Sequence, residues 1–354
     1  MEEFKEYREQ TKRMVEEGNL WEKVRPMLFV MCGLQCSGKS TQAKEYVKYQ
    51  DATIVSSDGI REELAKEQNK ENIFDVDNNL VFRELYKRVN DLLKENKNVV
   101  LDATNTTIKS RRQIFENIKV DCYKECHIMN TPYEECLERL RERNKKGPYI
   151  PEDVLERYYK SFEVPFKEEG WDNIVIDREI SYEDSQKWLK EIEDKARDFD
   201  QHNKWHNEKL LQHMVTTHSK MIDMQFEMRE TGRYDKDEQE MILIATRLHD
   251  LGKLYTQVFD KEGQAHYYNH ENVGAYEMIC NAAIYKYKFY NYYGYIYSIT
   301  DTLRVAFYIN YHMKLHQVKT EKAIKKWKGI FGEKSYNNLK LFEEADKYRI
   351  EKGE

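Results

Sequence analysis

The chain has 354 residues, with 58 Lys and Arg against 64 Asp and Glu, which gives a formal net charge of -6. That balance excludes a uniformly basic, non-specific nucleic-acid coat, and a content of 40% apolar and 34% charged residues excludes a disordered chain. The length predicts two domains, each large enough to bury its own core.

The sequence predicts a cytoplasmic protein with no membrane partner. No apolar run approaches the roughly 20 residues that span a bilayer, and the opening residues MEEFKEYREQ do not resemble a signal peptide. Cys122 and Cys126 have a spacing found in metal sites, but without a second pair we expect a strand there and not a zinc site. The cysteines are scattered, and free thiols are expected at Cys32, Cys36, Cys122, Cys126, Cys136 and Cys280.

Short apolar segments alternate with helix-like stretches in the first half of the chain. This alternation predicts a parallel sheet with helices on both faces, and the five predicted strands cover 27–32, 52–56, 98–101, 126–129 and 173–176. The second half lacks strand alternation and holds nine of the ten histidines, so it is predicted to be all-α. The predicted organisation is an N-terminal helix (1–26), an α/β domain (27–180), a linker helix (181–200) and a helical domain (201–354).

A phosphate-binding loop follows the first predicted strand. The stretch Gly33-Leu-Gln-Cys-Ser-Gly38-Lys39-Ser40-Thr41 fits the pattern G-x-x-x-x-G-K-[ST]. Its backbone N–H groups would wrap phosphates, Lys39 would reach the β- and γ-phosphates, and the Ser40 hydroxyl would hold Mg²⁺. The candidate ATP site therefore comprises Gly33, Ser37, Gly38, Lys39, Ser40 and Thr41.

Polar residues also follow the second and third predicted strands. Asp58 could accept the proton of an attacking hydroxyl, or it could cap the next helix, and both roles can hold together. Arg61, one helical turn later, could bind an acceptor phosphate with two hydrogen bonds. Asp102 is either an outer ligand of magnesium or a contact to the acceptor.

Cationic residues near 109–112 and 139–143 each have two interpretations. Arg139 and Arg143 precede a loop and suit a lid that neutralises the transferred phosphoryl group, although an ordinary salt-bridged helix is the plainer interpretation. Lys109 and Arg112 could contact a nucleic-acid backbone or form a solvated helix face.

Residues 27–180 resemble the kinase domain of 5′-hydroxyl polynucleotide kinases of the phage end-healing type. The resemblance rests on GLQCSGKST, SSDGIR, DATNTT and RNKKGPYIPEDVLERYYKSF. It implies an α/β P-loop kinase fold, with Lys39 and Ser40 on ATP and Mg²⁺. It also implies that Asp58 is the base for the 5′-OH.

The same resemblance extends to the acceptor and the lid. It implies that Arg61 contacts the 3′-phosphate of the acceptor nucleotide, and that Arg143, together with Arg139, belongs to the lid. The chain departs from the family at Ala103, because an acidic residue is expected directly before Thr-Asn. The acid stands one place earlier, as Asp102, which leaves the role of Asp102 open.

The second half carries a candidate metal site. His249 and Asp250 are adjacent in LHDLGK, and imidazole with carboxylate suits Mg, Mn, Fe or Ni. Lys253 follows where it could stabilise a departing phosphate oxygen. Further potential ligands on helix-like stretches are His213, His266, His270, His312, His316 and Asp346, as a one- or two-metal hydrolytic site requires.

Residues 205–350 resemble the HD superfamily of metal-dependent phosphohydrolases. The stretch LHDLGKLYTQVFDKEGQAHYYNHENVGA is similar to the HD domain of bacterial tRNA nucleotidyltransferases. The resemblance implies His213, His249 and Asp250 as ligands of one metal. It further implies His270 and His312 as ligands of a second metal, with Asp346 as the closing carboxylate. The histidines expected at the surface or outside the ligand set are His202, His206, His218 and His266.

Aromatic residues alternate with lysines between Tyr285 and Tyr297. They could stack unpaired bases, but the pattern favours helix packing. A hydroxyl kinase joined to an HD phosphohydrolase resembles enzymes of RNA end healing. We therefore expect an ATP- and Mg²⁺-dependent 5′-OH kinase combined with a phosphatase for 2′,3′-cyclic, 2′- or 3′-phosphates that uses Mn²⁺, Ni²⁺, Co²⁺ or Fe²⁺. The expected partners are RNA or DNA ends and a separate RNA ligase.

Two other functions are compatible with the same motifs. One is a small-molecule nucleoside or sugar kinase fused to an HD nucleotidase. The other is a kinase with a regulatory HD module that only binds a nucleotide.

Overall fold

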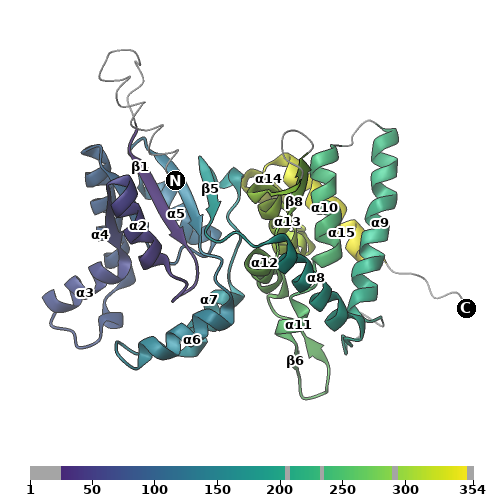
Figure 1. Cartoon of the computed structure of the whole chain (residues 1–354), viewed down its shortest axis with the longest axis horizontal. Helices are drawn as coiled ribbons and strands as arrows, with labels where there is room; N and C mark the ends of the chain where they lie inside the picture. Colours follow the sequence, from purple (N-terminus) through teal and green to yellow (C-terminus); the bar gives the residue numbers. More distant parts are fainter. Residues whose placement is uncertain (1–24, 204–207, 232–234, 289–293, 349–354) are drawn as a thin grey trace, which may run out of the picture. The chain divides into compact units, whose positions relative to one another are not determined.

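The computed structural model describes residues 25–203, 208–231, 235–288 and 294–348, so the helix predicted over 1–26 lies almost wholly outside the described residues (Figure 1). The chain forms two compact units. Unit 1 comprises the described residues up to Met129, Glu135–Ile150 and Gly170–Asp177. Unit 2 comprises Asn130–Glu134, Pro151–Glu169 and the described residues from Arg178 onward.

Unit 1 is built on a five-stranded parallel sheet, which confirms the predicted α/β fold. The strand order is β2-β3-β1-β4-β5, so β1 lies at the centre, and every residue of β1 is buried. Its near-continuous apolar sequence is typical of a strand covered on both faces. The strands are β1 (Met27–Cys32), β2 (Ala52–Ser56), β3 (Asn98–Asp102), β4 (Tyr123–Ile128) and β5 (Asn173–Ile176).

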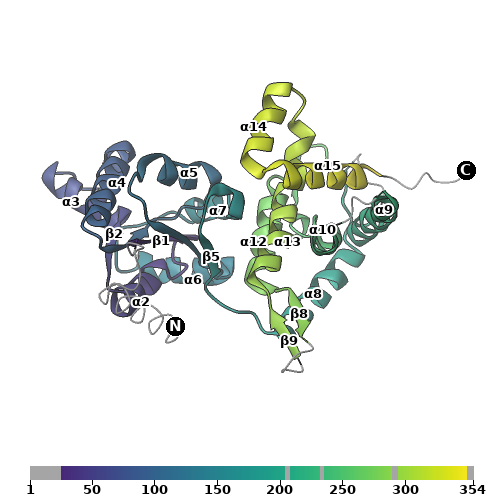
Figure 2. The ribbon, with the colours of Figure 1, turned by 90° about the horizontal axis from the view of Figure 1, so that it is seen from above.

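Helices cover both faces of this sheet. Figure 2 shows α2 (Lys39–Gln50) on one face, and α4 (Asn78–Lys94) and α5 (Ile108–Asn117) on the other. The buried residues of α4 recur every four positions, from Val81 to Leu93, which gives the helix one apolar stripe against the sheet. The remaining elements are α3 (Ser57–Glu67), the 3₁₀ segment η1 (Ile73–Asp75) and α6 (Tyr133–Asn144), whose first two residues belong to unit 2.

Unit 2 is mainly helical. Its centre is α12 (His270–Asn281) packed on α13 (Ile299–Tyr311), and most residues of both helices are buried. Around them lie α7 (Glu152–Lys160), α8 (Tyr182–Arg197), α9 (Leu210–Glu230), α10 (Lys236–Leu248), α11 (Lys253–Thr256), α14 (Glu321–Phe331) and α15 (Glu333–Lys347). Two 3₁₀ segments complete the helical part, η2 (Lys167–Glu169) and η3 (His312–Gln317). Among the described residues, no helix combines the length and the apolarity needed to cross a bilayer.

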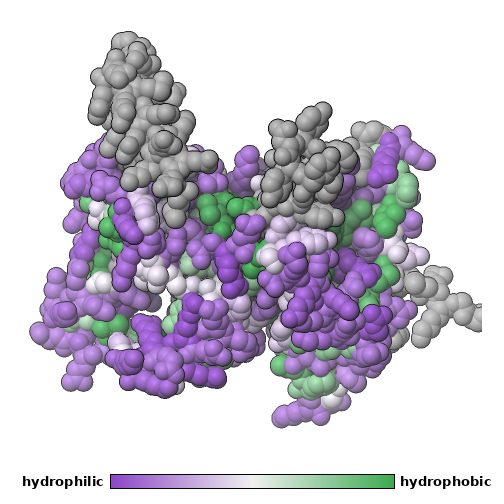
Figure 3. Space-filling view, viewed as in Figure 1, coloured by the Kyte–Doolittle hydropathy of each residue, from purple (hydrophilic) through white to green (hydrophobic). Residues whose placement is uncertain are grey.

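Two antiparallel strand pairs interrupt the helices of unit 2, so the prediction of an all-α second half is wrong at these points. They are β6 (Val258–Phe259) with β7 (Ala265–His266), and β8 (Tyr285–Lys288) with β9 (Gly294–Tyr297). The second pair also overturns the helix expected between 285 and 297, because tyrosines alternating with lysines have the period of a strand and a high strand propensity. Part of that segment, 289–293, lies outside the described residues. Val258 and Phe259 of the β6–β7 hairpin are exposed, and Figure 3 shows hydrophobic surface at this hairpin.

Candidate functional site

The phosphate-binding loop joins β1 to α2. Gly38 has φ 96° and Cys36 has φ 61°, and α2 begins directly after Gly38. The left-handed conformation at Gly38 is one that glycine adopts without steric cost, and it turns the chain into the helix. Gly33 N–H donates to Thr104 O at 2.9 Å, which ties the loop to the residues after β3. Ser40 and Thr41 are exposed in the first turn of α2, where an anion is favoured.

Lys39 is folded against its own loop. Its ammonium donates to Gly33 O at 3.1 Å and to Leu34 O at 2.5 Å, and the side chain is buried. Burial lowers the pKa of Lys39, and the nearby Asp102 carboxylate acts in the opposite direction. A cation at this point of the loop is suited to bind phosphate oxygens.

Asp102 lies beside the hydroxyl predicted to hold magnesium. The Ser40 hydroxyl donates to Asp102 Oδ2 at 2.8 Å, and Asp102 is the last residue of β3, which pairs with β1. Hydroxyl and carboxylate oxygens are the ligands that Mg²⁺ prefers in phosphoryl-transfer sites. Of the two roles left open by the sequence, this geometry favours the outer ligand of magnesium.

Asp58 and Arg61 lie together in the first turns of α3. Ser56 is the N-cap of α3 and accepts from Gly59 N–H at 3.4 Å, so the alternative role of Asp58 as N-cap is wrong, because the helix begins before it. Arg61 donates to Asp58 Oδ1 and to Asn78 Oδ1, both at 2.8 Å. The Asp58 side chain is 58% exposed while that of Arg61 is 11% exposed, so the carboxylate is open to an acceptor and the guanidinium is anchored.

Arg139 reaches the phosphate loop from α6. Its Nη1 donates to Cys36 O at 3.3 Å, and its Nη2 pairs with Glu135 one turn earlier. Arg143 is half-buried near the end of α6, and within the described part of the chain its side chain forms no hydrogen bond or ion pair. The structure therefore brings Arg139 to the loop and does not bring Arg143 there. The Asn144 side chain joins the two ends of the loop that follows α6. Its Oδ1 accepts a hydrogen bond from Ile150 N–H at 3.0 Å, and its Nδ2 donates to Ile150 O at 2.8 Å.

The basic residues after β3 face different surroundings. Arg111 is fully buried and donates to Asn105 O at 3.2 Å, so it holds the fold. Arg112 pairs with Glu116 at 3.3 Å on an exposed face, which favours the solvated interpretation, and Lys109 is exposed.

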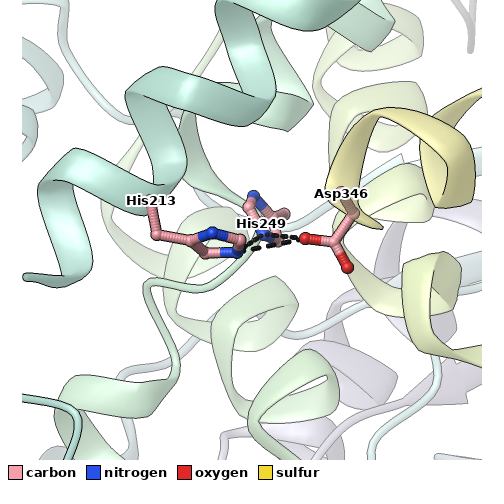
Figure 4. A group of neighbouring side chains, drawn as sticks. All are labelled: His213, His249 and Asp346. Atoms are coloured by element: carbon pink, nitrogen blue, oxygen red, sulfur yellow. Dashed lines mark hydrogen bonds and ion pairs between the residues drawn. The ribbon is translucent and has the colours of Figure 1, made fainter. Parts of the chain in front are cut away.

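The six predicted metal ligands meet inside unit 2. His213 lies on α9, and His249 and Asp250 are the two residues that follow α10. His270 begins α12, His312 begins η3, and Asp346 lies near the end of α15. Two overlapping groups are close enough to share a cation: His213 with His249 and Asp346, and His249 with Asp250 and His312. Figure 4 shows the imidazoles of His213 and His249 facing the Asp346 carboxylate, with His213 Nε2 and His249 Nε2 each 3.1 Å from Asp346 Oδ1.

Asp250 stands between two sets of imidazoles. Its Oδ2 lies 3.3 Å from His213 Nε2 and 3.4 Å from His249 Nε2. Its Oδ1 lies 3.1 Å from His270 Nε2 and 3.7 Å from His312 Nε2. One carboxylate therefore faces both predicted ligand sets.

Backbone carbonyls orient three of these histidines. The Nδ1 atoms of His249, His270 and His312 bond the carbonyl oxygens of the residues three positions earlier, at 2.9, 2.8 and 2.8 Å. A carbonyl accepts a hydrogen bond from Nδ1–H and so keeps the proton on Nδ1, which leaves Nε2 with the lone pair that ligates metal. The Nε2 atoms of His312 and His316 are buried and accept no hydrogen bond from a described residue. Buried nitrogens without a donor fit a cation in this position.

The carboxylates control protonation of the cluster. Burial lowers the pKa of His213, but hydrogen bonds to Asp250, Asp346 and Glu208 outweigh it and raise the pKa to about 10. Burial also lowers the pKa of His249, but the carboxylates outweigh this effect and raise the pKa to about 9, with the charge of Asp250 as the largest contribution. A divalent cation would displace these protons, since neutral imidazole is the ligand form.

Three contacts of the cluster lie outside the ligand set that the sequence predicted. Glu208 Oε1 lies 3.3 Å from His213 Nδ1, and His316 Nε2 lies 3.6 Å from Asp346 Oδ2. Lys253 Nζ lies 2.7 Å from Asp250 Oδ2 and is buried, so it holds that carboxylate. The sequence indicated His316 and Lys253 as candidates but not these contacts, and nothing in it singled out Glu208.

The other histidines lie apart from the cluster. His218 bonds Leu243 O and Thr246, while His266 pairs with Asp260 at 2.9 Å and His202 lies 3.6 Å from Asp200. His206 lies outside the described residues.

Close packing requires a glycine at position 252, two residues after Asp250. A Cβ at this position would come within 1.9 Å of His270 O, so only glycine allows the start of α12 to approach this turn. That approach keeps His270 beside Asp250.

Comparisons with known proteins agree with the loop and sheet of unit 1. Residues 28–165 match the family described as an AAA domain. The L-seryl-tRNA(Sec) kinase of Methanococcus maripaludis is 27% identical over 252 residues, which cover 67% of this chain and 94% of that protein. The UPF0200 protein of Thermococcus onnurineus is 30% identical over 148 residues, which cover 38% of this chain and 78% of that protein.

Among solved structures, the Pnkp1/Rnl/Hen1 RNA repair complex contains a similar chain. It is 23% identical with a TM-score of 0.35, and the match covers 39% of this chain and 44% of that one, so this chain spans less than half of the length of that relative. The protein belongs to the P-loop kinase family described as an AAA domain, through residues 28–165, and is a relative of the UPF0200 protein.

Proposed function

We propose that the chain is a bifunctional RNA end-healing enzyme. One site transfers the γ-phosphoryl group of ATP to a 5′-hydroxyl, and the other removes a 2′,3′-cyclic, 2′- or 3′-phosphate. The observation that carries the proposal is the presence, on one chain, of a phosphate-binding loop and a buried cluster of six potential metal ligands. Cleaved RNA commonly carries a 5′-OH and a cyclic phosphate, and joining such ends requires both to be converted.

In the kinase reaction, Asp58 accepts the proton of the acceptor hydroxyl. The hydroxyl oxygen attacks the γ-phosphorus, the bond from that phosphorus to the bridging oxygen breaks, and ADP leaves. Lys39 and Arg139 offset the negative charge on the phosphates, and Arg61 binds a phosphate of the acceptor. Ser40 and Asp102 would hold Mg²⁺, and Arg143 would approach with the acceptor bound.

In the hydrolase site, His213, His249, Asp250 and Asp346 would hold one cation, and Asp250, His270 and His312 a second. A bound Mn²⁺, Ni²⁺, Co²⁺ or Fe²⁺ supplies a Lewis acid and a water of lowered pKa. The chain contributes orientation, because backbone carbonyls hold three of the imidazoles and Lys253 holds Asp250.

A second candidate for the kinase acceptor comes from the similarity to a seryl-tRNA kinase. That relative's name gives an acceptor hydroxyl carried by an amino acid on tRNA, and its alignment covers 67% of this chain. Seryl-tRNA and an RNA with a 5′-OH should therefore be supplied in competition, with free nucleoside as a third acceptor. A preference for the nucleoside would contradict both an RNA 5′-hydroxyl and seryl-tRNA as the acceptor.

Two single substitutions separate the proposed activities. With ATP, Mg²⁺ and Mn²⁺, we expect Lys39→Ala to lower 5′ phosphorylation by about 10²-fold or more and to leave the 3′ end reaction intact. Asp250→Ala should have the opposite effect, because it removes the carboxylate between the two ligand sets. Mass analysis of both RNA ends measures the outcome. Unchanged 5′ phosphorylation in Lys39→Ala would overturn the kinase assignment, and an inert 3′ end in the wild type with Mn²⁺, Ni²⁺ or Co²⁺ would overturn the hydrolase assignment.

A further inference from the structure

A basic segment lies next to the metal-ligand cluster in the sequence and in unit 2. We define it as residues 314–328, which contain six lysines and a single acid, Glu321. The whole chain has a net charge of -6, so this concentration of positive charge is local. A local cationic surface on an acidic protein attracts a polyanion without making the whole protein bind one.

The lysines of this segment are available to a ligand. Lys322, Lys325 and Lys326 are exposed on α14, and their spacing of three and four residues puts them on one face of the helix. None of these three forms an ion pair with any residue that the structure describes, whereas Lys328 pairs with Glu333 at 3.0 Å. Lys326 Nζ also lies 5.3 Å from the centre of the Trp327 ring, but no described carboxylate neutralises any of these three exposed ammonium groups, so they can bind an external anion.

The apolar side of α14 is already covered by unit 2. Phe331 is fully buried, and its ring lies 5.0 Å from that of Trp327 and 5.4 Å from that of Phe307. A helix that binds a membrane surface inserts its apolar face into the lipid, so this helix lacks the free face that such binding requires. Its solvent side offers charge alone, which suits the phosphates of a nucleic-acid backbone.

The segment begins at the accessible side of the cluster. η3 starts at His312, whose side chain is 1% exposed, and continues through Lys314 to His316, whose side chain is 24% exposed. His316 is the most exposed of the histidines around the cluster, and it lies 3.6 Å from Asp346 Oδ2. Lys314 also contacts α14, since its ammonium lies 4.8 Å from the centre of the Trp327 ring. Positive charge thus continues from the cluster to α14.

We propose that the basic segment binds the sugar-phosphate backbone of a single-stranded RNA whose 3′ end lies in the metal cluster. The inference rests on the proposed hydrolase function and names its substrate as a polynucleotide. Lys314 would contact phosphates near the end, and the exposed face of α14 would contact phosphates farther along the strand. Binding is electrostatic and independent of sequence.

The test compares two double variants with the same charge change. K322Q/K325Q removes two lysines of the basic segment, and K187Q/K190Q removes two exposed lysines of α8, in the same unit and with the same spacing. The full-length Mn²⁺-loaded protein is titrated with a labelled single-stranded RNA that carries a 3′-phosphate. We expect K322Q/K325Q to weaken binding about tenfold at low salt and to reduce the slope of log affinity against log salt by about 1.4, with no change in the control.

A second readout separates this proposal from the proposed function. Hydrolysis by K322Q/K325Q should show an increased KM for the RNA and an unchanged KM for a nucleoside 3′-monophosphate. Wild-type RNA binding by K322Q/K325Q, or equal losses on both substrates, would overturn the role of the segment. Binding to anionic phospholipid vesicles but not to RNA would overturn it as well. If the wild type hydrolyses neither substrate, the hydrolase function fails, while the binding titration still decides the role of the segment.

Discussion

At the end of β3, the Asp102 carboxylate accepts a hydrogen bond from the Ser40 hydroxyl at 2.8 Å. The sequence left two roles for this residue, because its family resemblance predicts an acid one position later. The sheet order accounts for the contact, because β3 is the neighbour of β1 and the last residue of β3 therefore meets the first turn of α2. Asp102 therefore makes this contact from position 102 itself.

Asp102→Asn tests this role. We expect the variant to lower phosphoryl transfer by about 10²-fold at limiting Mg²⁺, since the amide lacks the negative charge that favours a cation. Steady-state rates across a Mg²⁺ titration measure the effect, and higher Mg²⁺ should restore part of the activity. Asp121→Asn, at an exposed acid of unit 1, is the control. A Mg²⁺ dependence identical in Asp102→Asn and in the control would contradict the role.

At the scale of elements, α7 and α12 are joined through a buried carboxyl. Tyr159 Oη donates to Glu277 Oε1 at 2.5 Å, and Asn281 Nδ2 donates to Glu277 Oε2 at 3.1 Å. Burial is the main cause that raises the pKa of Glu277 to about 7, and Glu134 adds to the rise. Below that pH the protonated carboxyl is stable between these helices, and above it a buried charge forms.

Stability should therefore decrease as the pH rises. The unfolded Glu277 carboxyl titrates near 4.5 and the folded one near 7, so the stabilisation is full below pH 4.5 and is lost as the pH rises through 7. The loss amounts to about 3 kcal/mol. Urea unfolding of unit 2 at a series of pH values between about 4.5 and 6.5 measures the effect of Glu277, and Glu277→Gln should remove the decrease over this range. The raised pKa values of His213 and His249 act at higher pH. If the wild type and Glu277→Gln respond equally to pH, the carboxyl is not the responsible group.

At the scale of the whole molecule, the chain passes between its two units several times. Unit 2 includes Pro151–Glu169, a stretch that the sequence assigned to the α/β half. Phe166 from this stretch is buried, and its ring lies 5.1 Å from that of Phe307 and 5.7 Å from that of Phe331. Val164 N–H also donates to Asn310 Oδ1 at 2.8 Å. Segments far apart in the sequence thus complete one core.

Phe166→Ala should destabilise unit 2 by about 3–5 kcal/mol, because it leaves a cavity among aromatic rings. Phe226→Ala, at a ring of the same unit that is 59% exposed, should change stability by no more than about 0.5 kcal/mol. Thermal and urea unfolding followed by a probe in unit 2 compare the two variants. Equal, small effects would show that the 151–169 segment adds little to this core.

The sequence predicted those features that depend on neighbouring residues along the chain. The five strands and the phosphate loop follow from short apolar runs and one spaced motif, and both are local patterns. The β8–β9 pair was missed because the row of tyrosines was interpreted as helix packing, although its alternation with lysine has the period of a strand. The contact of His316 with Asp346 depends on how η3 and α15 pack together, so the sequence could name His316 but not its partner. Glu208 lies only five residues from His213, but nothing distinguishes it from the other acids of the chain. The burial of Arg111 could not be predicted either, because nothing near it in the sequence distinguishes it from the exposed Arg112.

The interleaving of the two units limits how the protein can be divided. A single cut near residue 200 would leave the C-terminal fragment without the Phe166 ring, which packs in its core. The N-terminal fragment would keep the 151–169 segment but lose the rest of the core in which that segment packs. Neither piece corresponds to a complete folding unit. Proteolysis or gene splitting at that boundary should therefore abolish the hydrolase activity proposed for unit 2. Exchange of one half between homologous proteins should succeed only when residues 130–134 and 151–169 are exchanged with it.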